Sequence, residues 1–154
     1  GEQLKVCLQD IKDTFDYIII DCPPSLGVIT TNALTASNSV IIPVQCEFFA
    51  LEGITQLLKT VMLAQKTLNP TLDIEGVLLT MLDSRTNLGL QVIEEVKKYF
   101  QQKVYKTIIP RNIRLAEAPS HGLPINIYDS KSTGAESYRL LAEEVIHRGE
   151  EEWQ

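Results

Sequence analysis

Short apolar runs that favour extended structure alternate along this chain with longer segments of helical spacing. Three runs are rich in β-branched residues and predict strands: Tyr17–Ile20, Ser39–Val44 and Ile74–Leu82. Residues 50–68 and 88–102 place apolar side chains three and four residues apart, the spacing of an amphipathic helix. Strands joined through helices of this length predict βαβ units. We therefore expect an α/β fold in which a parallel β-sheet is flanked by helices.

The remaining elements are expected to be short. Residues 2–15 predict a helix that leads into the first strand, residues 28–36 a second helix, and residues 107–109 a strand that ends at Pro110. Asn112 has the side chain of an N-cap for a helix over residues 113–118. The last helix should start near Thr133, with Glu136 completing a capping box. These elements predict one α/β domain over residues 1–154.

Composition excludes several classes of protein. The 154 residues are 44% hydrophobic and 22% charged, which is ordinary for a globular domain. No apolar run approaches the roughly eighteen residues of a membrane span, and the N-terminus has no secretory pattern, so we expect a cytoplasmic protein. Cys7, Cys22 and Cys46 are odd in number and form no CxxC pair, which predicts free buried thiols rather than disulfides or a zinc site.

The stretch Tyr17–Gly27 holds the first candidate site. Its uninterrupted apolar run predicts a strand buried on both faces, and Asp21 follows at the carboxyl end, where open α/β sheets bind ligands. Pro23, Pro24 and Gly27 then prevent the chain from continuing as a strand. This pattern resembles the Walker B strand and switch loop of a nucleotide triphosphatase. An aspartate that only caps a turn is the alternative.

A basic stretch is the second candidate site. The chain has a net charge of −6, yet no carboxylate occurs from Lys97 to Ala116. Charge segregation of this kind in an acidic protein predicts a surface for a polyanion, whereas a solvated helix face is the simpler alternative. The cations of this stretch are Lys97, Lys98, Lys103, Lys106, Arg111 and Arg114.

Five stretches together resemble the ParA/Soj family of chromosome and plasmid partition ATPases, which are relatives of MinD. They are IIIDCPPSLG (18–27), IIPVQCEFFALEG (41–53), GVLLTMLDSRTNLG (76–89), IPRNIRLAEAPSHGLPINIYD (109–129) and STGAESY (132–138). The resemblance implies a P-loop NTPase fold of the deviant Walker A, MinD/ParA type. It also implies ATP and Mg²⁺ as cofactors of the parent protein.

The resemblance assigns roles to individual residues. Asp21 corresponds to the Walker B carboxylate, which holds Mg²⁺ through water. Switch II corresponds to Pro23, Pro24, Ser25 and Gly27. Pro110 and Asn112 correspond to the loop that contacts the nucleotide base. Arg85 and Arg114 match arginines implicated in sequence-independent DNA binding, and the other cations of the basic stretch are candidates for further contacts. Asp83 follows its strand as Asp21 does, and we expect it to orient Arg85 or the base loop.

One departure from the family pattern changes these expectations. No GxxxxGK motif occurs in the sequence, so the P-loop that cradles phosphate is missing. We therefore expect the chain to be the C-terminal portion of the family's domain, incomplete at the N-terminus and without ATPase activity of its own. In the family the P-loop strand lies beside the Walker B strand. Without it, Ile18–Asp21 and Val40–Val44 are expected either to pair directly or to self-associate.

The functional expectation is a chromosome or plasmid partition protein. As the resemblance implies, the parent would be a homodimeric, nucleoid-associated ATPase that binds DNA without sequence preference and is stimulated by a ParB/Spo0J-type partner. A MinD-like, membrane-associated regulator of cell division is one alternative, although the acidic end GEEEWQ opposes an anionic membrane. A metabolic amide-forming ligase of the same superfamily is the other. We expect no contact with a membrane.

Overall fold

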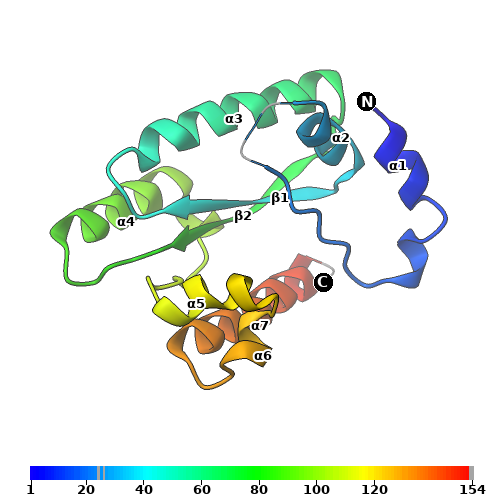
Figure 1. The fold of residues 1–154 in the computed structure, drawn as a ribbon. Helices are drawn as coiled ribbons and strands as arrows, with labels where there is room; N and C mark the ends of the chain where they lie inside the picture. Colours follow the sequence, from blue (N-terminus) through cyan, green and yellow to red (C-terminus); the bar gives the residue numbers. More distant parts are fainter. Residues whose placement is uncertain (24, 26, 153–154) are drawn as a thin grey trace. The chain divides into compact units, whose positions relative to one another are not determined.

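The computed structural model describes every residue except 24, 26, 153 and 154. Figure 1 labels its elements in chain order. They are α1 (Gln3–Leu8), α2 (Val28–Ala36), β1 (Ser39–Gln45), α3 (Ala50–Thr67), β2 (Asp73–Thr80), α4 (Asn87–Phe100), α5 (Ile113–Glu117), α6 (Ile125–Tyr128) and α7 (Thr133–Glu152). Internal contacts divide the chain into two compact units: Gly1–Val40 with Gly53–Glu75, and Ile41–Glu52 with Gly76–Gln154. The single domain over residues 1–154 stays a prediction.

The first unit is built around helix α3. Val61 and Ala64 of α3 pack with Leu72 in a buried cluster, which Leu34, Val40 and Ile74 border. The Asn69 amide then donates to the backbone oxygens of Leu34 (3.0 Å) and Ser37 (2.7 Å), which ties the turn after α3 to the end of α2. The apolar spacing of residues 50–68 predicted this helix, and the element is confirmed.

The second unit is built around strand β2. Val77 and Leu79 are fully buried. The segment after α4 runs parallel to β2: the Tyr105 nitrogen donates to the Val77 oxygen and the Ile109 nitrogen to the Leu79 oxygen, both at 2.9 Å. A Cβ added at Gly76 would lie 2.5 Å from the Tyr105 ring, so this position of β2 needs a glycine. Leu78, Tyr105 and Ile109 form one buried cluster of the unit, against which Leu141 and Val145 of α7 pack.

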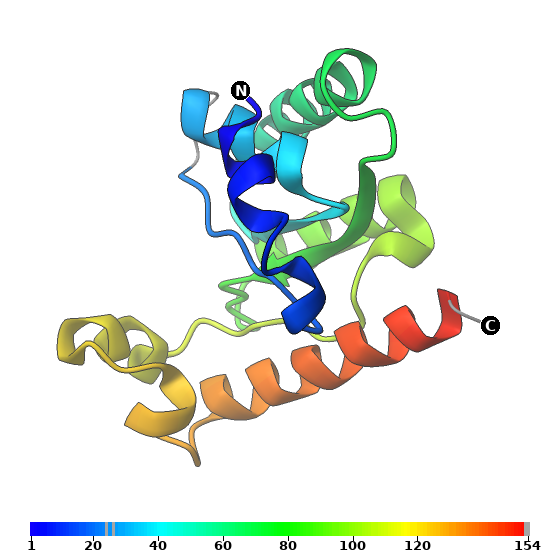
Figure 2. The same cartoon turned by 90° about the vertical axis from the view of Figure 1, so that its right-hand side faces the viewer.

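Two side chains of α7 hold it against the segment that follows α4. The Glu144 carboxylate accepts from the backbone nitrogens of Lys106 (2.8 Å) and Thr107 (2.9 Å). The Arg148 guanidinium donates to the Val104 oxygen at 2.9 Å and lies 4.2 Å from the centre of the Tyr105 ring. Figure 2 shows α7 as one long helix, coloured orange to red. The helix is therefore fixed by specific contacts along its middle and final turns.

The α/β fold with a parallel sheet is confirmed. β1 and β2 pair in one parallel sheet. The Asp73 nitrogen donates to the Asn38 oxygen where the two strands begin, and the Cys46 nitrogen donates to the Thr80 oxygen where they end. Both strands were predicted, and only their ends differ from the expected bounds. The burial pattern differs between them: β2 is buried over Gly76–Leu79, whereas β1 alternates, with Ile42 buried and Ile41 42% exposed.

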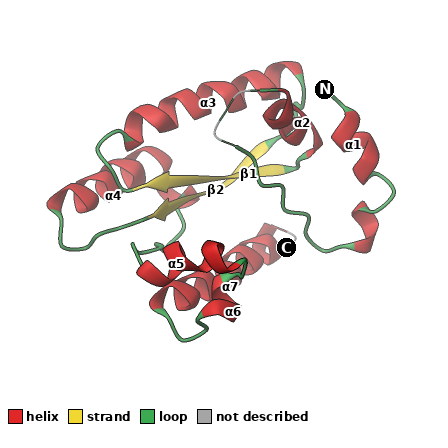
Figure 3. Ribbon diagram, viewed as in Figure 1, coloured by secondary structure: helices red, strands yellow, loops and turns green. Residues whose placement is uncertain are grey.

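The predicted strand Tyr17–Ile20 is wrong. Figure 3 shows this part of the chain as loop, and Ile19 is 92% exposed. A strand needs a hydrogen-bonded neighbour, and β1 pairs with β2 instead of with this segment. Direct pairing of Ile18–Asp21 with Val40–Val44 is therefore contradicted as well, within the described part of the chain. The helix expected over residues 2–15 is likewise shorter, because α1 ends at Leu8.

Two smaller predictions also need correction. The capping box at the start of α7 does not form: the Ser132 hydroxyl accepts from the Ala135 nitrogen at 3.1 Å, while Glu136 pairs with Arg139 at 2.9 Å. The cap is thus one residue earlier than predicted. Of the three thiols, Cys46 is buried as expected, but Cys7 and Cys22 are exposed. Burial raises the pKa of the Cys46 thiol.

Candidate functional site

The loops that follow the strands of the second unit gather the chemistry-bearing side chains. Glu47 follows β1, Asp83 and Arg85 follow β2, and Arg111 follows the segment that runs beside β2. Parallel strands place these loops at one edge of the sheet, the edge where open α/β sheets bind ligands. An ion pair of 3.7 Å between Arg111 Nη2 and Glu47 Oε1 links two of the loops.

Arg85 is held in a two-point contact by Asp83. Its Nε donates to Asp83 Oδ1 at 2.9 Å and its Nη2 to Oδ2 at 2.8 Å, while its backbone nitrogen donates to Oδ1 at 3.1 Å. These bonds, with a smaller contribution from the nearby Arg111 charge, lower the pKa of Asp83 to about 2. The Arg85 side chain remains 85% exposed. The predicted contact from Asp83 to Arg85 is confirmed.

The backbone between β2 and α4 is shaped for this contact. Met81 has a φ of 54°, a left-handed conformation that is uncommon for a residue with a side chain. Thr86 closes the loop, because its hydroxyl donates to the Asp83 oxygen at 2.9 Å and accepts from the Gly89 nitrogen at 3.3 Å as the N-cap of α4. The sharp turn at Met81 and the Thr86 cap fix where Asp83 and Arg85 lie.

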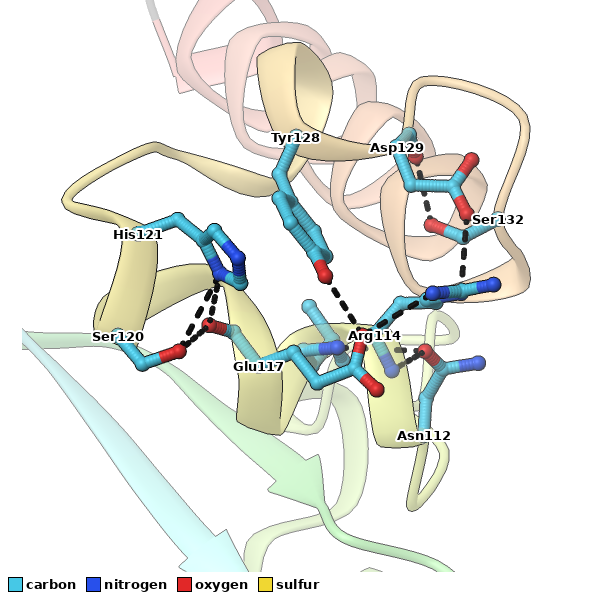
Figure 4. Close-up of polar contacts among 9 residues, drawn as sticks. Asn112, Arg114, Glu117, Ser120, His121, Tyr128, Asp129 and Ser132 are labelled. Carbon is cyan, nitrogen blue, oxygen red and sulfur yellow. Dashed lines mark hydrogen bonds and ion pairs between the residues drawn. The ribbon is translucent and has the colours of Figure 1, made fainter.

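Arg114 lies between two carboxylates, as Figure 4 shows. Its Nη1 is 3.1 Å from Glu117 Oε2, and its Nε is 3.3 Å from Asp129 Oδ2. The Tyr128 hydroxyl donates to the same Glu117 oxygen at 2.7 Å. The Tyr128 hydrogen bond and then the Arg114 contact lower the pKa of Glu117. Arg114 is therefore a surface cation with two acidic partners, and its side chain is 54% exposed.

Asn112 organises the short helix that carries Arg114. Its Oδ1 accepts from the backbone nitrogens of Arg114 (3.0 Å) and Leu115 (3.3 Å), which confirms the predicted N-cap. Its Nδ2 donates to the Thr133 hydroxyl at 2.7 Å, which joins α5 to the start of α7. A Cβ added at Gly134 would lie 2.5 Å from Leu115 Cγ, so glycine allows the two helices to approach. The contact of Pro110 and Asn112 with a nucleotide base stays a prediction.

The basic stretch is acid-free in sequence but not in space. Lys98 pairs with Glu95 at 3.1 Å, Arg111 with Glu47, and Arg114 with Glu117 and Asp129. The carboxylates lie outside residues 97–116. Glu95 and Glu117 are close to the ends of the stretch in sequence, whereas folding brings in Glu47 and Asp129. Three cations of the stretch are therefore paired with acids, and the predicted polyanion surface stays a prediction. Lys97 and Lys106 are exposed, and Lys103 is partly buried.

The candidate nucleotide residues of the Asp21 stretch lie in the first unit. Asp21 and Pro23 are exposed and belong to no strand, Ser25 is exposed in a bend, and Gly27 is the residue before α2. Pro24 lies outside the described residues. Among the residues that the structure describes, no group of three or more His, Cys, Asp or Glu side chains could hold a metal ion.

Comparison with known proteins gives relatives of high identity. A family described as "AAA domain" matches residues 1–74. The chain is 69% identical over 147 residues to the sporulation initiation inhibitor protein Soj of Bacillus subtilis, a match that covers 96% of this chain and 58% of that protein. It is 56% identical to the chromosome-partitioning ATPase Soj of Treponema pallidum, over 94% of this chain and 57% of that protein. The resemblance to the ParA/Soj family is confirmed.

Solved structures agree on the fold. The cobyrinic acid a,c-diamide synthase of Mycobacterium smegmatis, with bound ADP and magnesium, has a TM-score of 0.77 and 37% identity, and the match covers 97% of this chain and 54% of that one. The cell-division ATPase MinD of Pyrococcus furiosus has a TM-score of 0.75 at 24% identity, over 95% of this chain and 58% of that one. The chain spans a little over half the length of the relatives it matches. None of its described helices has the length and apolarity to cross a membrane.

Sequence reasoning missed the carboxylates that hold Arg114. Glu117 stands three residues after Arg114 on the same short helix, a spacing at which side chains meet, so this partner was within reach of the sequence. Asp129 comes from the end of α6 and becomes a partner only when α5 and α6 pack together. Tyr128 was likewise not predicted. It contacts Glu117 and affects Arg114 only through that glutamate.

Proposed function

We propose that this chain is part of an ATP-dependent chromosome or plasmid partition protein. In this proposal the whole protein works as a homodimer on the nucleoid, binds DNA without sequence preference and is stimulated by a ParB/Spo0J-type partner. The observation that carries the proposal is the 69% identity to Soj of Bacillus subtilis across 96% of the chain. The other matched relatives include the partitioning protein ParA of Myxococcus xanthus, at 54% identity.

Arg85 and Arg114 are the DNA contacts in this proposal, with Arg111 and the lysines at 97, 98, 103 and 106 around them. Arg85 supports it by geometry: its guanidinium is 85% exposed on a loop at the ligand-binding edge of the sheet. Contacts of this kind go to phosphate, so DNA affinity should fall steeply with salt and hardly depend on sequence.

The test is the DNA affinity of the Arg85→Ala, Arg114→Ala double variant, measured by fluorescence anisotropy with duplexes of unrelated sequence. Losing two phosphate contacts should weaken binding and flatten the plot of log affinity against log salt by roughly two units. Arg139→Ala is the matched control, because it removes an exposed, ion-paired arginine of α7 without touching the strand-end loops. Binding by the double variant equal to that of the unchanged chain would refute these contacts.

The nucleotide half of the site is proposed for the whole protein. Asp21 would hold Mg²⁺ through water, residues 23–27 would form the second switch, and Pro110 and Asn112 would lie at the base. Related structures with bound nucleotide and magnesium support this assignment. The 154-residue chain should hydrolyse no ATP, because it has no GxxxxGK loop to bind phosphate. A phosphate-release assay that found turnover, lost in Asp21→Ala, would contradict this.

One alternative function has an observation in its favour. The Mycobacterium smegmatis structure at 37% identity is described as a cobyrinic acid a,c-diamide synthase, an amide-forming enzyme. Partition remains the better-supported function, since the relatives named as Soj are more similar to this chain, at 69% and 56% identity. DNA binding that depends on Arg85 and Arg114 distinguishes the two, because an amide-forming enzyme has no need of it.

A further inference from the structure

Arg114 differs from an ordinary DNA-contacting arginine in the number of carboxylates that hold it. Its guanidinium is contacted through Nη1 by Glu117 and through Nε by Asp129. One positive and two negative charges leave this cluster net negative. A DNA phosphate that approaches it therefore meets repulsion before it meets a donor. The cluster is visible in Figure 4, in which Arg114 lies between the two acidic side chains.

We propose that Glu117 and Asp129 set the strength of DNA binding by competing with DNA phosphate for the Arg114 guanidinium. This inference rests on the proposed function, because it concerns the same DNA-contacting arginine. The two carboxylates are positioning residues: they act on DNA only through Arg114. Binding requires at least one of the two intramolecular contacts to be exchanged for a contact with phosphate.

Tyr128 makes Glu117 an effective competitor. Its hydroxyl donates to Glu117 Oε2 at 2.7 Å, the same oxygen that contacts Arg114. A carboxylate that is already fixed loses little side-chain entropy when it pairs with the arginine, so the contact is stronger than that of a freely moving glutamate. The ring of Tyr128 is held in turn by His121, whose ring centre lies 4.7 Å away.

Arg85 provides the internal comparison. It is held by one carboxylate, Asp83, and its side chain is 85% exposed, against 54% for Arg114. Phosphate can approach the open side of Arg85 without displacing a second acid. The two arginines should therefore contribute differently to DNA binding. Arg85 contacts phosphate first, whereas Glu117 and Asp129 limit how much Arg114 contributes.

The size of the effect follows from the exposure of the cluster. Ion pairs between exposed side chains are weak, and DNA presents closely spaced phosphates. DNA binding can therefore replace a carboxylate contact of Arg114 with a phosphate contact. Removing one competing charge should tighten DNA binding by about two- to fivefold, the range expected when a single exposed ion pair is lost.

The experiment measures the affinity of the 154-residue chain for a labelled duplex of arbitrary sequence, by anisotropy, between about 50 and 200 mM salt. Glu117→Gln removes the charge and keeps an oxygen that can accept from Tyr128. Glu143→Gln is the matched control, because it removes the same charge at an exposed position of α7. Both changes are also made in an Arg114→Ala background, and thermal unfolding checks that each variant is folded.

The expected result is tighter binding by Glu117→Gln, a smaller change for Glu143→Gln, and no gain from Glu117→Gln once Arg114 is alanine. Asp129→Asn should act in the same direction and serves if Glu117→Gln does not fold. Equal shifts for Glu117→Gln and Glu143→Gln, or a gain that survives in Arg114→Ala, would overturn the inference and leave the DNA site standing. If Arg85→Ala and Arg114→Ala have no effect on binding, the proposed function fails together with the inference.

Discussion

At the scale of residues, the strand-end loops use arginines whose charges are balanced by nearby acids. Arg85 and Asp83 form a two-point contact, whereas Arg111 reaches Glu47 across two loops at 3.7 Å. Arg suits this arrangement better than Lys, because its planar group can meet both oxygens of one carboxylate or two separate acids. The sites thus depend on where the acids lie as much as on where the cations lie.

The Asp83 contact should be visible in a pH titration. Its pKa of about 2 in the folded protein is below the ordinary value of 3.8, so the pair contributes stability at neutral pH that is lost as the pH falls through 3.8 toward 2. Carbon NMR should place the midpoint of the Asp83 carboxyl near 2. In Arg85→Ala the midpoint should rise toward 3.8 but stop short of it, because the backbone nitrogen of residue 85 still donates to Asp83.

Arg139→Ala is the control for this titration, since Arg139 pairs with Glu136 rather than with Asp83. It should leave the Asp83 midpoint where it was. A midpoint that is the same in the unchanged chain and in Arg85→Ala would mean that the contact with the guanidinium does not exist in solution.

At the scale of elements, the sequence predicts best where local pattern and tertiary contacts agree. The bounds of α2, α3 and α4 and the start of α7 were predicted to within a few residues, because apolar spacing and capping residues act within each helix. Tyr17–Ile20 has the same strand-forming composition as β1, yet it stays unpaired. Strand propensity cannot supply a neighbour, so composition alone could not separate the two segments.

The candidate site was predictable in part for the same reason. The family resemblance indicated Arg85 and Arg114, a local signal identified the Asn112 cap, and the contact of Asp83 with Arg85 lies within three residues of sequence. The pairing of Arg111 with Glu47 and of Arg114 with Asp129 joins separate elements. A count of charges along residues 97–116 does not include Glu47 and Asp129, which folding brings to Arg111 and Arg114.

Glu144 offers a test at this scale, because its carboxylate binds two backbone nitrogens on the outer side of the segment beside β2. Glu144→Ala should leave the backbone nitrogens of Lys106 and Thr107 without that acceptor, which should lower the free energy of unfolding by about 1–3 kcal/mol. It should also expose this backbone edge to pairing with other molecules. Denaturant unfolding and sedimentation velocity measure the two effects.

Glu143→Ala is the control for this change, since it removes the neighbouring exposed glutamate of the same helix. It should leave both the unfolding free energy and the sedimentation profile close to those of the unchanged chain. Equal behaviour of the two variants would show that the Glu144 carboxylate does not protect this edge.

At the scale of the whole molecule, the two units carry different parts of the proposed function. The arginines and their acids belong to the second unit, and Asp21 belongs to the first. The chain matches 58% of the length of Soj from Bacillus subtilis. The DNA contacts are nevertheless testable on this chain, since the side chains proposed for them all lie within the second unit.

The exposed apolar run at residues 17–20 has a further consequence for the whole molecule. Segments that nucleate cross-β fibrils are typically six or seven residues long, of high β-propensity and low charge. Tyr17–Ile20 has the required propensity, but Asp16 and Asp21 enclose it and limit the uncharged stretch to those positions. The two aspartates therefore act as gatekeepers. They keep the exposed hydrophobic segment too short to stack into a fibril.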